Sequence, residues 1–118
     1  MVAEKHQSAD GLLTLIVSRD DEDITIGFDG YTWHTHGALL AASYPFGDVA
    51  GLTPETAAAR FVEDVVSNRA VIVVQRVLGE VRDVWVTQDV AGELRYANPE
   101  EILEFRYWDG REIRPSAG

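Results

Sequence analysis

Residues 53–78, TPETAAARFVEDVVSNRAVIVVQRVL, decide the fold class, because within them a helical pattern gives way to a strand pattern. Thr53-Pro54-Glu55 is typical of a helix start: threonine can cap free amides, proline fits the first turn, and glutamate faces the positive end of the helix dipole. The apolar residues that follow recur at helical spacing, at Ala58, Phe61, Val62, Val65 and Val66. The pattern therefore predicts one amphipathic helix over residues 54–68.

Strand signals lie on both sides of this helix. Residues 71–78 are rich in β-branched side chains, and Gly79-Glu80 suits a tight hairpin turn into the next strand. Upstream, apolar residues alternate with small or polar ones over 24–28, and Asp29-Gly30 is a second hairpin signal. The expected strands, in chain order, are residues 12–18, 24–28, 31–36, 71–78, 81–87, 93–97 and 102–108, with room for a short edge strand at 112–113.

These elements predict an α+β fold. Short hairpin links make neighbouring strands antiparallel, so we expect one antiparallel sheet of about six strands with the helix packed on one face. The length fits a single domain over residues 1–118, with flexible tails at 1–10 and 115–118 and a long loop, with room for one helical turn, at 37–52. The other face of the sheet would be partly exposed or would serve an interface.

The composition excludes several functional classes. The chain carries a formal net charge of −10 and has no cysteine. An acidic surface disfavours non-specific binding to nucleic acid or anionic membranes, and without cysteine there are no disulfides or thiolate metal sites. The polar first ten residues hold no signal-peptide core, and no apolar run approaches the ~20 residues that span a bilayer. We therefore expect a cytoplasmic protein that binds neither nucleic acid nor membrane.

The negative charge is concentrated in one segment. Residues 20–59 contain seven acidic residues and no lysine or arginine, and they account for −7 of the net charge. We expect them to form a strongly negative end of the domain, which would steer a basic partner protein towards it. The alternative is that these acidic loops only keep a small protein in solution. The predicted partner-binding residues are Asp20, Asp21, Glu22, Asp23, Asp29, Trp33, His34, His36 and Asp48.

His34-Thr35-His36 is the sharpest local motif. Histidines two apart on a strand project from the same face, so both imidazoles could reach one metal ion. A third ligand could come from His6, from Asp48 or from the acidic turn at 20–23, but none of these lies at the spacing of a known site. We therefore expect no bound metal or cofactor. A metal-binding domain or metal-dependent hydrolase centred on the two histidines is the alternative.

The chain resembles the small bacterial immunity proteins of polymorphic and contact-dependent toxin systems. The resemblance lies in the stretches at residues 24–28 and 31–36, in the helix that follows them, and in the strand at 69–74. The resemblance implies a non-enzymatic, cytoplasmic protein that binds one cognate toxin domain, often a basic nuclease, and blocks it. It identifies no inhibitory residues in this chain. A homodimer that uses the uncovered sheet face, with Trp85 or Trp108 at the interface, is a further possibility.

Overall fold

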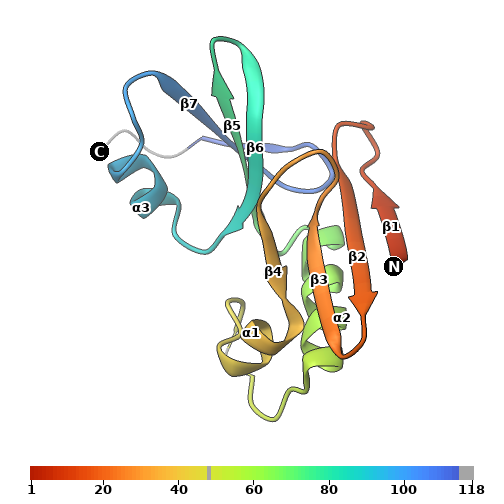
Figure 1. The fold of residues 1–118 in the computed structure, drawn as a ribbon. Helices are drawn as coiled ribbons and strands as arrows, with labels where there is room; N and C mark the ends of the chain where they lie inside the picture. The colour runs from red at the N-terminus through yellow and green to blue at the C-terminus, as the bar shows by residue number, and fades with distance from the viewer. Residues whose placement is uncertain (48, 115–118) are drawn as a thin grey trace.

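A computed structural model describes residues 1–47 and 49–114 of the chain (Figure 1). The α+β class is confirmed, but the strands form two antiparallel sheets of four strands each rather than one sheet of six. The elements, in chain order, are β1 (Val2–Gln7), β2 (Thr14–Asp20), β3 (Asp23–Phe28), β4 (His34–His36), α1 (Gly37–Ala42), α2 (Pro54–Val66), β5 (Val71–Val77), β6 (Glu80–Thr87), α3 (Val90–Arg95), β7 (Glu101–Arg106) and β8 (Glu112–Ile113). No helix in these ranges is both long and apolar enough to cross a membrane.

The N-terminal sheet has the strand order β1-β2-β3-β4, so each strand lies beside its neighbour in the chain. Alternation decides which face is buried, because successive side chains on a strand point to opposite faces. The apolar residues of β2 and β3 pack against α2, which lies across one face of this sheet (Figure 1). The buried members of these two strands are Leu15, Val17, Ile24, Ile26 and Phe28.

Helix α2 confirms the predicted amphipathic helix. The Thr53 hydroxyl accepts a hydrogen bond from the Thr56 amide at 3.1 Å, and the Thr56 hydroxyl accepts one from the Thr53 amide, so the first turn is capped. Phe61, Val62 and Val65 are buried against the N-terminal sheet as the periodicity predicts. Asp64 is not part of the predicted apolar stripe but is also buried.

The C-terminal sheet has the strand order β6-β5-β7-β8, and no hydrogen-bonded strand pair joins it to the N-terminal sheet in the described ranges. The prediction of one continuous sheet is wrong because β4 ends after three residues, where α1 begins, and so offers little edge for another strand. The two sheets still share one core, since Ile72, Val74 and Val84 belong to the same apolar cluster as α2.

Several shorter elements also differ from the predictions. Residues 2–7, expected within a flexible tail, pair with β2 as an edge strand. The expected strand at 93–97 is instead helix α3, because Asp89 caps it by accepting a hydrogen bond from the Gly92 amide at 3.0 Å. The expected strand at 31–36 is reduced to β4, and the loop at 37–52 begins with α1. The predicted tail at 115–118 lies outside the described residues.

Buried Arg106 ties the two sheets together. Its guanidinium donates hydrogen bonds to the Asp10 carboxylate at 2.7 Å and to the Trp108 carbonyl at 3.1 Å. Asp10 lies in the turn before β2 and Arg106 at the end of β7, so the contact with Asp10 links the N-terminal sheet to the C-terminal sheet. The hydrogen bond from Arg106, helped by one from Ser8, holds the pKa of Asp10 well below its usual range. A second ion pair, half-buried, joins β5 to β7, where Arg76 Nε and Glu104 Oε1 are 2.8 Å apart.

A second buried polar cluster fixes the segment after α1. The Tyr44 hydroxyl donates to the Asp64 carboxylate at 2.5 Å, and the Arg69 guanidinium donates to the other carboxylate oxygen at 3.2 Å. Burial and the hydrogen bond to Asp64 raise the pKa of Tyr44 above its usual value. Asp64 is therefore buried without being unpaired, which is the condition under which a carboxylate is tolerated in a core.

Candidate functional site

The candidate site is the side of the N-terminal sheet that faces away from α2, which we call the outer face. Strand register places two rows of side chains across it. Ile16, Gly27 and His34 form one row, and Ser18, Thr25 and His36 form the next. Across β2, β3 and β4 these rows present one apolar side chain, one glycine, two hydroxyls and two imidazoles. On β1, exposed Lys5 pairs with Ile16 and exposed Val2 pairs with Ser18, so they extend the two rows.

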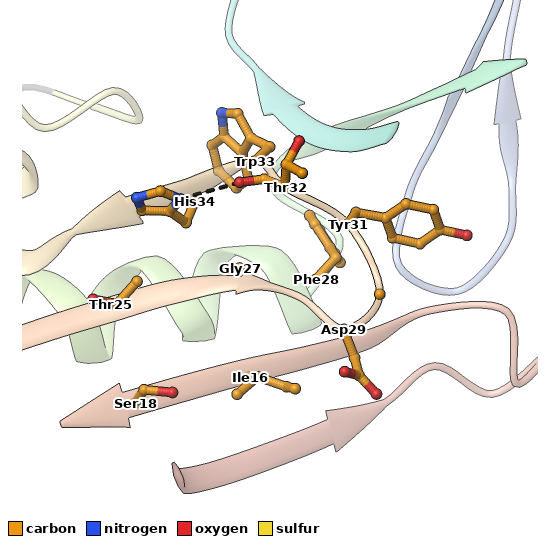
Figure 2. Close-up of a pocket in the computed structure, with 11 residues that line it drawn as sticks. Ile16, Ser18, Thr25, Gly27, Phe28, Asp29, Tyr31, Thr32, Trp33 and His34 are labelled. Atoms are coloured by element: carbon orange, nitrogen blue, oxygen red, sulfur yellow. Dashed lines mark hydrogen bonds between the residues drawn. The ribbon is translucent and has the colours of Figure 1, made fainter. Parts of the chain in front are cut away.

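Gly27 makes a close approach of the backbone possible on this face. A Cβ atom at Gly27 would lie 2.9 Å from the Trp33 carbonyl oxygen and 3.3 Å from the His34 Cβ, so any side chain there would displace the chain that enters β4. Without one, a hollow of about 300 Å³ remains between β2, β3 and the β3–β4 loop (Figure 2). No lysine or arginine is among the described residues that line this hollow.

The β3–β4 loop that borders the hollow is held from the other sheet. Asp83 of β6 accepts a hydrogen bond from the Thr32 hydroxyl at 3.3 Å and one from the Trp33 amide at 3.4 Å. The Tyr31 amide donates to the Phe28 carbonyl at 3.2 Å and closes the turn. Because the loop is anchored at both its turn and its end, the shape of the hollow depends on the contact between the two sheets.

Both histidines of the motif lie on the outer face, as alternation predicts, and their ring centroids are 5.0 Å apart. His34 Nδ1 is 3.1 Å from the Thr32 carbonyl oxygen (Figure 2). His36 Nδ1 is 3.2 Å from the Asp23 carboxylate. A carbonyl or an ionised carboxylate can only accept, so we assign the proton of each neutral ring to Nδ1. The Nε2 lone pair of each ring then remains available.

Thr25, His36 and Asp23 are the residue types of a catalytic triad, but their arrangement is not that of one. In a triad the histidine uses one ring nitrogen for the nucleophile and the other for the carboxylate. Here the Thr25 hydroxyl, at 3.5 Å, and the Asp23 carboxylate, at 3.2 Å, both approach His36 Nδ1. The carboxylate therefore cannot orient His36 as a base for this threonine.

The predicted acidic residues do not form one cluster. Residues 20–23 form the β2–β3 turn, whereas Asp29 follows β3 at the other end of the sheet, roughly 20 Å away at the rise of an extended strand. Asp20 contacts the Met1 amino group at 2.7 Å, and Asp23 contacts His36. Asp21, Glu22 and Asp29 are exposed and form no ion pair with any described residue. Asp48, also predicted at the site, lies outside the described residues.

The third metal ligands considered from the sequence do not complete a site. His6 is on β1, where it pairs in register with Leu15 and contacts Glu4 at 3.1 Å. Asp23 reaches His36 through Nδ1, the protonated nitrogen, and so does not share a coordination position with the two Nε2 atoms. Over residues 1–47 and 49–114, no group of three or more histidine or acidic side chains is placed to hold a metal ion.

Trp33, predicted to contact a partner, is half-buried between the hollow and the core. Ile16, Gly27 and Thr25 were not predicted as site residues, although the alternation in β2 and β3 already assigns them to the face opposite the core. Asp83 was also missed, and no local signal identifies it, because its role depends on a contact between separate sheets.

Comparisons of this sequence with protein-family models, with curated proteins and with solved structures returned no match.

Proposed function

We propose that this chain is a non-enzymatic protein-binding module whose outer face contacts a basic partner protein. The observation that carries the proposal is a sheet face that no other described element covers, with carboxylates at both ends that form no ion pair within residues 1–47 and 49–114: Glu22 in the β2–β3 turn and Asp29 beside the hollow. As an immunity-type protein it would act in the cytoplasm and neutralise a cognate toxin, for which a basic nuclease is the expected class.

The dimensions of the outer face suit one interface. A standard protein–protein contact buries about 800 Å² on each partner, a patch roughly 30 Å across. The two acidic ends of β3 are roughly 20 Å apart at strand rise, so one partner can contact both. The hollow over Gly27 lies between them and can accept a protruding side chain. Charges at the edge of an interface mainly raise the association rate and exclude wrong partners.

The test begins with capture of the partner from the native host, followed by purification of that partner and measurement of association rates with the chain. Glu22→Lys combined with Asp29→Lys reverses two exposed charges on the proposed face. Glu80→Lys combined with Glu100→Lys makes the same change in net charge at the far end of the C-terminal sheet, where both residues are exposed.

We expect the first pair to slow association by about tenfold at low salt, because steering depends on local potential. The difference from wild type should shrink as the salt concentration rises and the Debye length falls. The control pair should change the rate far less. Equal effects from the two pairs would mean that only net charge matters, and an unaffected rate in the first pair would refute the proposed face.

A further inference from the structure

We propose that His34 and His36 form a surface binding site for a divalent cation of the zinc, nickel or copper class, held through their two Nε2 atoms. The inference takes up the metal-binding alternative raised by the His34-Thr35-His36 motif. It rests on observations other than those used for partner binding, although both histidines lie on the same outer face. It concerns a site built from two protein ligands only, since no described third ligand is in place.

The proposal rests on the hydrogen bond that each ring can donate from Nδ1. In metal sites a histidine ligand almost always donates its second ring N–H to a carboxylate or a backbone carbonyl, which fixes the tautomer and orients the ring. Each histidine here has such an acceptor before any metal is bound: the Thr32 carbonyl for His34 and the Asp23 carboxylate for His36. In the neutral form, with the proton assigned to Nδ1, both rings therefore present the unprotonated nitrogen that a metal requires.

The two rings lie close together on the same face of the sheet. Both project from the outer face in adjacent rows of the sheet, and their centroids are 5.0 Å apart with planes 85° apart. In Figure 2 the second ring nitrogen of His34 points away from Thr32. Zinc binds imidazole nitrogen at about 2.0–2.1 Å and takes four ligands, so two positions would remain for water or for a side chain of another molecule.

The two imidazole ligands determine which metal ions the site would bind. Imidazole nitrogen suits zinc, copper and nickel, whereas magnesium and calcium prefer oxygen ligands. A catalytic zinc site has three protein ligands, so the two imidazoles describe a binding site rather than a hydrolase centre. Asp23 is a positioning residue in this arrangement: it contacts His36 on the side opposite the metal and holds the proton on Nδ1.

The test is a titration of the full chain with zinc chloride, followed by calorimetry and by NMR of the histidine ring nitrogens. We expect one ion per chain, with shifts of Nε2 in both His34 and His36 while Nδ1 stays protonated. His34→Ala or His36→Ala should abolish this binding, His6→Ala should leave it unchanged, and magnesium chloride should produce none of it. All three histidines are at least partly exposed, so folding of the variants can be checked by the same NMR spectra.

The Asp23→Asn variant distinguishes two explanations of zinc binding. In the proposed site Asp23 orients His36, whereas two histidines that bind zinc only because they are exposed would not need this carboxylate. Loss of the carboxylate that orients a ligating histidine typically weakens metal affinity by about tenfold or more. We expect that loss for zinc, while the fold and the His34 resonances are retained. The proposal is overturned if the wild-type chain shows no saturable zinc binding, if only one ring shifts, or if Asp23→Asn binds zinc as tightly as wild type.

Discussion

Replacing Asp10 with asparagine should destabilise the protein by removing the carboxylate that neutralises a buried cation. The Arg106 side chain is 7% exposed, and its Nη1 donates to Asp10 at 2.7 Å. Removing one partner of a fully buried ion pair costs about 3–5 kcal/mol. The Asp10 side chain is 39% exposed, so water can partly replace it, and asparagine can still accept a hydrogen bond. We therefore expect a loss of about 2 kcal/mol at neutral pH.

The assay is urea unfolding of wild type and Asp10→Asn. With a slope of about 1.5 kcal/mol per molar urea, the expected loss lowers the midpoint by about 1.3 M. Asp21→Asn is the matched control, because Asp21 is exposed and asparagine tolerates its backbone φ of 56°. This control should change the stability by less than about 0.5 kcal/mol.

The pH dependence tests the same contact. The hydrogen bond from Arg106 lowers the pKa of Asp10 in the folded state, so its stabilising contribution is complete above the unfolded pKa of about 3.9 and declines as the pH falls towards the folded value. The gap between wild type and Asp10→Asn should therefore narrow by about two-thirds between pH 7 and pH 3, from about 2 to about 0.7 kcal/mol. A gap below 0.5 kcal/mol at pH 7, or one that stays constant with pH, would refute this account of the ion pair.

Two further substitutions test the packing around α1. Gly37→Ala should destabilise the protein by about 1–3 kcal/mol in thermal unfolding, because the new Cβ would lie 2.6 Å from the Pro54 carbonyl oxygen. Helix propensity alone predicts the opposite, a gain in stability from alanine, and such a gain would contradict the close contact. Tyr44→Phe should cost about 1–2 kcal/mol in urea unfolding by leaving buried Asp64 with one donor fewer, and an unchanged midpoint would show that this hydrogen bond contributes nothing.

Local patterns were sufficient to predict the elements whose signals lie within a few residues. Helix α2 was predicted from its capping residues and apolar spacing, and the β5–β6 hairpin from β-branched residues around a glycine turn. Helix α3 was missed because its capping contact involves one short side chain, Asp89, in a segment that also resembles a strand. Strand β1 was missed because an edge strand buries little of itself, so its residues carry no apolar pattern.

The candidate site was predicted in part. Alternation alone places His34 and His36 on one face, and the structure confirms it. The charge count located the acidic segment in the sequence, but it did not predict that the acidic residues lie in two separate places. Strand β3 puts Asp29 at the opposite end of the sheet from the turn at residues 20–23. The hollow could not be predicted, because it depends on the approach of Trp33 to Gly27 and on Asp83 from another strand.

The sequence by itself therefore determined the α+β class, the existence of the helix predicted over residues 54–68, and the side of each strand on which a residue lies. Helix and strand periods are local properties of the chain. Only the tertiary structure decided that the strands divide into two sheets, that Arg106 and Asp64 are buried with partners, and that a hollow opens beside His34. These features arise from contacts between residues far apart in the chain. Arg106 and Asp10, for example, are 96 positions apart, and no local pattern connects them.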